Sequence, residues 1–312
     1  MKMTNKLKER FCKDMNIPIR VFEEPYFESR LKLYDKQYET VSKYEMFKAL
    51  VEKFGNEENY LEVYNKLKDS IINFLEETEG MKRFKEVDMN QFKVVNEGFP
   101  KNDIYKQTFD GRVFISIDMR KANFTALKHF DKGIVGNCDT YEDFMGMFTD
   151  EEYFKQSKYI RQVVFGNQNP KRQTTYEKFL MDSVLTELLK FTKDKKDIVF
   201  FSNDEIVVDV TDKTEPEREM YSERVQEVLD KQAKQGVYLR QEVFVLRHIP
   251  NTDGYVRKFM NKEGYDFKCV GGLLMPFVLR AYSGDEVQEE DKVFLYEGKL
   301  AKLLEVPVVE VV

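Results

Sequence analysis

Apolar side chains in the first hundred residues recur at the three- and four-residue spacing of an amphipathic helix. One such helix face is formed by Leu61, Tyr64, Leu67, Ile71, Phe74 and Leu75. This helix should end near Gly80, and a capping-box pattern at 42–45 should begin another helix that ends at Phe54. We therefore expect residues 1–100 to form an N-terminal helical subdomain, with its boundary at 98–100.

After this boundary the pattern becomes that of β-strands. Residues 112–118 alternate and are rich in β-branched and aromatic side chains, which is typical of a strand. Two short apolar runs, 197–201 and 206–210, flank a polar tip at 202–205 and predict a β-hairpin. Residues 238–246 predict a further strand.

Two helical stretches separate these strands. One covers 140–192 and is interrupted at 167–172 by Asn, Pro and Gly. The other covers 217–235, and its expected buried side consists of Met220, Val225, Val228 and Leu229. The resulting order β-α-β-β-α-β is that of a ferredoxin-like unit. We therefore expect an α+β protein with a ferredoxin-like domain at 101–250, into which the first helical stretch is inserted.

Residues 251–312 predict a small C-terminal element. The runs 240–247 and 255–260 are joined by a turn rich in Pro, Asn and Gly and predict a second hairpin. The pattern of 273–305 predicts mixed helix.

Composition narrows the function classes. The chain has 312 residues, of which 42% are hydrophobic, so wholesale disorder is excluded. Its formal net charge of −6 excludes a basic protein that coats nucleic acid without specificity. Three scattered cysteines and two histidines imply neither a disulfide framework nor a zinc cluster, which leaves carboxylates and metal ions as the agents of any chemistry.

The sequence also indicates a compartment. The charged N-terminus has no signal-peptide pattern, and the longest apolar stretch, 270–279, is too short to span a bilayer. We expect an intracellular, cytoplasmic protein without a membrane partner. The abundance of Lys, Phe, Tyr and Asn is compatible with an AT-rich phage or virus genome.

Three carboxylates fall at positions that the predicted topology brings together. Asp118 closes the first strand, and Asp204 and Glu205 lie at the hairpin tip. In a ferredoxin-like sheet the first strand lies beside the hairpin, so these groups should converge at one sheet end. Adjacent carboxylates need a compensating cation, and Mg²⁺ or Mn²⁺ on Asp118 and Asp204 would supply it. The alternative is that hairpin tips favour Asn and Asp for turn geometry alone.

The segments that carry these acids resemble the palm domain of nucleic-acid polymerases, most closely family A DNA polymerases. Residues 117–124 (IDMRKANF) are similar to motif A, and 202–210 (SNDEIVVDV) are similar to motif C. Residues 158–166 (KYIRQVVFG) are similar to the motif B helix, which presents basic residues to a nucleoside triphosphate. The resemblance covers about 100 residues. It implies that Asp118 and Asp204 bind two Mg²⁺ ions, with Glu205 behind them or near the primer end.

The motif B segment has a helical geometry that supports the same interpretation. At 100° per residue, Lys158, Arg161 and Phe165 fall within about 60° of one another. The two cations could hold the triphosphate and the ring could pack on the base or sugar; the alternative is a solvated basic face with Phe165 in the core. Lys171 and Arg172 follow as a candidate contact to a nucleic-acid backbone.

Three asparagines differ from the family pattern. Asn203, Asn123 and Asn169 stand where family A carries His, the Glu that excludes ribose, and Tyr. Asn123 is therefore a candidate substrate contact with open sugar preference.

The sequence thus predicts a metal-dependent nucleotidyltransferase whose partners are a primer–template and nucleoside triphosphates. One alternative is a nucleotide-cyclase-like enzyme, whose Gly-Gly-Asp-Glu-Phe turn shares the Asp-Glu pair of 204–205 but not the glycines. The other is a catalytically degenerate palm that binds nucleic acid or acts in assembly.

Overall fold

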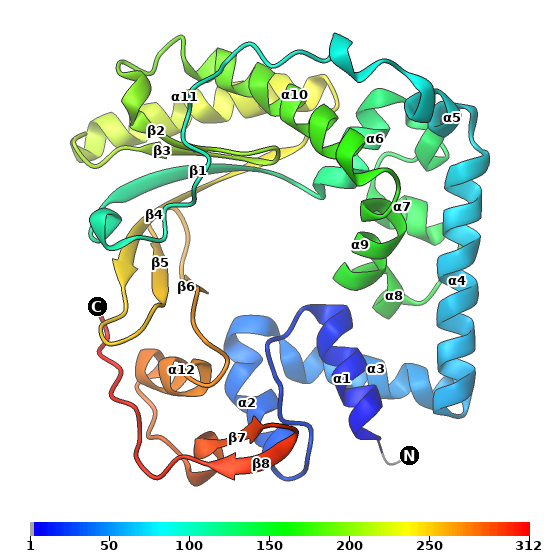
Figure 1. The fold of residues 1–312 in the computed structure, drawn as a ribbon, viewed down its shortest axis with the longest axis vertical. Coiled ribbons are helices and arrows are strands. Elements are labelled where there is room, and N and C mark those ends of the chain that lie inside the picture. The colour runs from blue at the N-terminus through cyan, green and yellow to red at the C-terminus, as the bar shows by residue number, and fades with distance from the viewer. Residues whose placement is uncertain (1–2) are drawn as a thin grey trace.

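The elements of the chain follow one another around a ring (Figure 1). The computed structural model describes residues 3–312. Twelve α-helices lie within that range: α1 Asn5–Met15, α2 Tyr26–Tyr38, α3 Thr40–Phe54, α4 Glu57–Glu77, α5 Glu79–Glu86, α6 Ala122–Phe130, α7 Tyr141–Gly146, α8 Glu152–Gln156, α9 Lys158–Gly166, α10 Pro170–Leu188, α11 Glu215–Lys234 and α12 Met275–Ser283. The strands are β1 Val113–Met119, β2 Ile198–Phe201, β3 Glu205–Asp209, β4 Leu239–His248, β5 Tyr255–Phe259, β6 Tyr265–Lys268, β7 Val293–Tyr296 and β8 Lys299–Lys302.

A six-stranded sheet with strand order β2-β3-β1-β4-β5-β6 forms one side of the ring. Every neighbouring pair in it is antiparallel. The expectation of an α+β protein is therefore confirmed. The strand at 112–118, the hairpin at 197–210 and the strand pair at 240–260 are also present, each within two or three residues of its predicted bounds.

The two faces of the sheet differ because side chains alternate along each strand. Ile115, Ile117 and Met119 of β1 face the main core, and α10 and α11 cover that side of the sheet (Figure 1). Phe114 faces the other way and belongs to a small second core with Val207 and Phe244 of the neighbouring strands. Beyond this second core, towards the end of β1, the same face carries polar and charged side chains.

The predicted N-terminal helices are present as α1 to α5. They do not fill all of 1–100, because residues 87–112 contain no α-helix and no strand, only two short 3-10 turns. The helix predicted from the 61–75 pattern ends at Glu77. The capping box at 42–45 is wrong: α3 already begins at Thr40, after Glu39 in the left-handed region (φ 53°). Met220 was placed on the buried side of α11, yet it is 50% exposed, because Tyr221 takes the core position.

The inserted helical stretch is a series of short helices, α7, α8 and α9, followed by the long α10. The break is shorter than predicted, since Asn169 adopts a left-handed φ of 53° and Pro170 is already the first residue of α10. The helix predicted within 273–305 is present only as α12 and the short 3-10 turn Glu289–Lys292. Residues 293–302 form the hairpin β7–β8 instead.

The ring is closed where the C-terminal element meets the N-terminal helices. α12 packs against α2, and the 3-10 turn Glu289–Lys292 contacts the same helix (Figure 1). A buried ion pair joins Arg30 of α2 to Asp291 of that turn, with Nη1 and Oδ1 2.8 Å apart. Contacts between residues distant in sequence thereby join the C-terminal element to the N-terminal helices.

Candidate functional site

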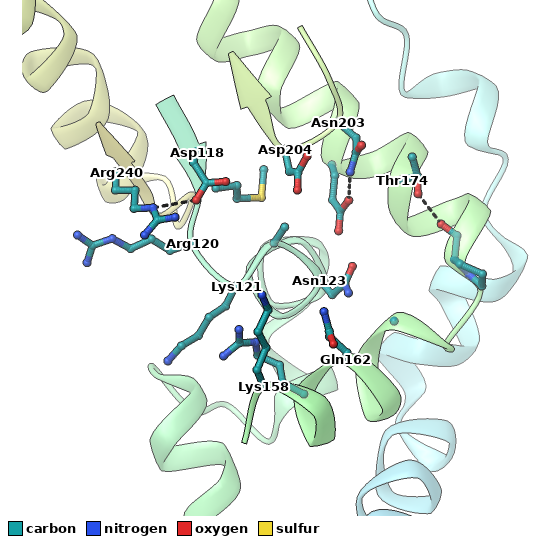
Figure 2. A pocket seen from close by; sticks show the side chains of 16 residues that line it. Asp118, Arg120, Lys121, Asn123, Lys158, Gln162, Thr174, Asn203, Asp204 and Arg240 are labelled. Atoms are coloured by element: carbon teal, nitrogen blue, oxygen red, sulfur yellow. Dashed lines mark hydrogen bonds and ion pairs between the residues drawn. The ribbon is translucent and has the colours of Figure 1, made fainter. Parts of the chain in front are cut away.

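A pocket of about 800 Å³ lies where the end of β1, the hairpin tip, α6, α9 and α10 meet (Figure 2). This volume lies in the usual range for small-molecule sites. Five of the residues singled out from the sequence line it: Asp118, Asn123, Lys158, Arg161 and Asp204. The predicted convergence of Asp118 and the hairpin tip at one sheet end is confirmed.

The backbone of the sheet brings the two aspartates together. Asp118 lies opposite Glu205 in the β1–β3 register, and the amide of Met119 donates to the carbonyl of Asp204 at 2.8 Å. Because this pairing extends one residue beyond the first residue of β3, the hairpin tip lies directly beside the last residues of β1. Figure 2 shows both aspartate side chains at the same end of the pocket.

Helix α10 fixes the hairpin tip from the other side. The Nδ2 of Asn203 donates to Oε2 of Glu177 at 2.7 Å. The ammonium of Lys178 donates to the carbonyls of Phe201 (2.9 Å) and Ser202 (3.1 Å). The position of Asp204 is thus set by tertiary contacts as well as by the turn.

Asp118 forms an ion pair with Arg240, whose Nε lies 2.9 Å from Oδ2. Burial raises the pKa of Asp118; Arg240 opposes this change, whereas Asp204 and Glu242 reinforce it. Asp204 accepts a hydrogen bond from Ser202 at Oδ1, 3.0 Å away. A cation shared by Asp118 and Asp204 would relieve their repulsion.

Glu205 lies on the same sheet face as Asp118 but does not line the pocket. Its Oε1 accepts a hydrogen bond from Ser116 Oγ at 2.5 Å. Burial is the main reason why the pKa of Glu205 is raised, and Asp118 adds to the effect. Glu205 therefore contributes negative potential beside the aspartates while its carboxylate is held by the neighbouring strand.

The pocket also has a cationic side, which begins with Arg240 directly beside Asp118. The side chains that make up this cationic side are Arg120, Lys121, Lys158, Arg161 and Arg240. Burial lowers the pKa of Lys158, and the nearby cations Arg161, Lys268 and Arg240 lower it further. Mutual repulsion of this kind makes the cationic side a favourable place for a polyanion.

Helix α9 presents Lys158 and Arg161 because the N-terminal helices hold it. Its N-cap Ser157 accepts from the amide of Ile160 at 3.1 Å and donates to the backbone carbonyl of Asp14 in α1 at 3.5 Å. The N-terminal helical layer thereby supports the cationic side of the pocket.

One sequence-based assignment is wrong, and a second residue is held more firmly by the protein than the sequence predicts. Phe165 is fully buried and packs against Phe124 and Phe144, so it anchors α9 in the core and has no surface to offer a base or sugar. Arg172 is held by backbone carbonyls at the end of α5: its Nε donates to Phe84 at 2.8 Å, and a second nitrogen donates to Val87. Lys171 is exposed, outside the pocket lining.

The sequence reasoning missed Arg240 and Glu177. Arg240 could have been found, because strand pairing places it directly opposite Asp118. Glu177 could not, since α10 carries no local sign that this acid is buried and faces the hairpin tip. Its Oε1 is buried without a hydrogen-bond partner among the described residues.

Glu177→Gln should remove a pH-dependent loss of stability. Burial, reinforced by Asp204, raises the pKa of Glu177 from 4.5 to about 7. The folded protein therefore binds this proton more tightly than the unfolded chain, and folding stability falls as pH rises from about 4.5 to 7. We expect the Gln variant to gain about 2–3 kcal/mol over the parent at pH 8 and almost nothing at pH 4.5. Urea unfolding at both pH values measures this, with exposed Glu62→Gln as the control; equal gains at both would contradict it.

Within residues 3–312, no group of three or more His, Cys, Asp or Glu side chains is arranged to hold a metal ion. Nor does any helix in this range combine the length and apolarity needed to cross a membrane. No family model, curated protein or solved structure matches the chain.

Proposed function

We propose that the protein is a metal-dependent nucleotidyltransferase with a polymerase-like palm, which adds nucleotides to the 3′ end of a nucleic acid. The observation that carries the proposal is the pocket itself. Two adjacent aspartates, Asp118 and Asp204, adjoin a cationic side made of five Lys and Arg residues, one of which, Arg240, pairs with Asp118. Phosphoryl transfer depends on positioning and on charge stabilisation, and these are the two things that such a pocket offers.

The sheet topology supports the palm interpretation. The strands β2-β3-β1-β4 have the order and antiparallel pairing that a ferredoxin-like β-α-β-β-α-β unit requires, with α10 and α11 on one face. The resemblance to family A motifs places the same acids at the same structural positions, the end of the first strand and the tip of the hairpin. The fold alone would not specify this function, because many functions use this architecture.

The donor set fits Mg²⁺, which commonly takes only one or two protein carboxylates and completes its octahedron with water and substrate phosphates. Asp118 Oδ1 and Asp204 Oδ2 accept no hydrogen bond from the described residues, so each aspartate has an oxygen for a cation. Bound Mg²⁺ would activate the attacking hydroxyl and neutralise charge on the phosphates. Mn²⁺ fits the same oxygens.

Different residues of the pocket would bind different parts of the nucleotide. Lys158 and Arg161 would hold the triphosphate from α9. Asn123 and Gln162 lie near each other in the pocket, away from the two aspartates, and their amide groups can hydrogen-bond to a sugar or base (Figure 2). Phe165 would act only by keeping α9 in place.

Nucleotide incorporation on a labelled primer–template tests the proposal. Reactions contain Mg²⁺ or Mn²⁺ with ribo- or deoxyribonucleoside triphosphates, and products are scored for primer extension and for cyclic nucleotides. We expect extension that requires the metal. Cyclic products would favour the cyclase-like alternative, and nucleic-acid binding without any turnover would favour the degenerate palm.

A further inference from the structure

Arg240 is a cation that already binds Asp118, the carboxylate proposed to hold a metal ion. Strand β4 places it opposite Asp118, and its Nε lies 2.9 Å from Oδ2 of that aspartate. The ion pair spans two neighbouring strands of the same sheet face, so the backbone sets the contact. Figure 2 shows the guanidinium at the rim of the pocket beside Asp118.

The rest of the guanidinium has no protein partner. The side chain of Arg240 is 49% exposed, and among the described residues the Asp118 contact is its one hydrogen bond. Its other N–H groups are therefore free to bind a ligand. Glu242, two residues further along β4, is already engaged by Lys262 at 2.6 Å and Arg257 at 3.4 Å and does not hold Arg240 in place.

A divalent cation bound to Asp118 would lie beside this guanidinium. Two cations on one carboxylate repel each other, and the metal has twice the charge, so the weaker ion pair should give way. An anion bound by the other basic side chains of the pocket would offer a displaced guanidinium a new partner. A planar guanidinium is well suited to bind phosphate oxygens through two N–H groups.

We propose that Arg240 holds Asp118 while the site lacks a divalent cation and transfers to a phosphate group of the bound nucleotide when the cation takes Asp118. The inference rests on the proposed function, because it assumes both the metal and the nucleotide phosphate. It makes Arg240 a substrate-binding residue whose contact depends on the metal. It also predicts opposite effects of one substitution on the two ligands.

The test is direct binding, without turnover. Mn²⁺ affinity is measured by electron paramagnetic resonance in the absence of nucleotide, and affinity for ATP is measured by calorimetry in saturating Mn²⁺. Arg240→Gln is compared with the parent and with Lys121→Gln. Lys121 also lines the pocket but pairs with Glu142, so the control removes the same charge without freeing Asp118. Thermal unfolding monitored by circular dichroism establishes that each variant is folded.

For Arg240→Gln we expect Mn²⁺ to bind about 2- to 5-fold more tightly than in the Lys121→Gln control, the effect of removing a half-exposed ion pair. ATP should bind about 10-fold more weakly or worse, the effect of losing charge-assisted hydrogen bonds. Mn²⁺ affinity equal to that of the control, or unchanged ATP affinity, would overturn the inference.

Asp118→Asn separates this failure from failure of the proposed function. If the parent binds Mn²⁺ and Asp118→Asn does not, the metal site stands whatever Arg240 does. If neither the parent nor Arg240→Gln binds Mn²⁺, both the proposed function and the role of Arg240 are overturned.

Discussion

Replacing Asp118 with Asn should lower nucleotide incorporation by about 10³-fold or more, and Asp204→Asn should do the same. Each change removes one of the two carboxylates proposed to hold the metal, which contributes several kcal/mol of transition-state charge stabilisation. A loss of about 4 kcal/mol corresponds to three orders of magnitude in rate. Primer extension measured under single-turnover conditions gives the rates, with Mn²⁺ tested beside Mg²⁺.

The fold should tolerate both substitutions. Burial raises the pKa of Asp118, so the folded protein does not favour its charged form, and a neutral isostere removes an unfavourable desolvation. The half-exposed ion pair with Arg240 is worth at most about 1 kcal/mol. Asp204→Asn keeps an oxygen that can accept from Ser202.

The matched control is Asp230→Asn, an exposed acid on α11 that hydrogen-bonds to Gln226 at 2.8 Å and lies outside the pocket. It should retain full activity. The proposed function would be wrong if Asp118→Asn and Asp204→Asn extended primers as fast as this control. Unfolding of both variants would instead show that the aspartates are structural.

The part of the site that could be predicted from the sequence is the part set by local pattern and strand order. Apolar and polar side chains alternate with period two in 112–118, and the turn at 202–205 lies between two apolar runs. β1 and the hairpin β2–β3 can therefore be predicted without tertiary information. Once those strands were placed in order, convergence of Asp118 and Asp204 followed from topology.

Helical periodicity was less informative, because it shows which residues share a face but not what covers that face. Lys158, Arg161 and Phe165 lie close in angle along α9, yet Phe165 is fully buried whereas Lys158 and Arg161 border the pocket. Likewise, the sequence around Arg172 gives no sign of its acceptors, because the carbonyls at the end of α5 are more than 80 residues away in sequence.

The hairpin β7–β8 was not predicted, because its turn lacks the usual sequence signal. Glu297 and Gly298 both have positive φ, 49° and 76°, which is the geometry of a type I′ turn. Asn-Gly and Asp-Gly are the pairs that identify such turns, whereas Glu at the first position is uncommon. The local sequence therefore predicts the β7–β8 pairing only weakly.

Ring closure had no local signal at all, and it gives the largest expected effect on stability. Arg30 and Asp291, 261 positions apart, are 5% and 0% exposed at their side chains. The second guanidinium nitrogen of Arg30 also donates to the carbonyls of Glu290 (3.2 Å), Asp291 (2.9 Å) and Val293 (3.1 Å). Asp291 accepts in addition from Arg280 Nε at 2.9 Å. This network ties α2 to the C-terminal element.

Arg30→Met should lower the free energy of unfolding by about 3–5 kcal/mol, since it leaves a buried carboxylate short of one cation and three backbone carbonyls without their donor. Urea unfolding followed by circular dichroism measures the change. Limited proteolysis should cut the variant sooner than the parent between α12 and β8, because the contact that holds this segment on α2 is gone.

Lys66→Met is the control, because Lys66 forms an exposed pair with Glu62 on α4 and should cost no more than about 0.5 kcal/mol. Asp291→Asn tests the same network from its other side, and it should also destabilise strongly because it leaves the Arg30 guanidinium buried without its counter-ion. If Arg30→Met and Asp291→Asn both cost as little as the control, the buried pair does not hold the ring closed. In that case the packing of α12 against α2 would be sufficient to close it.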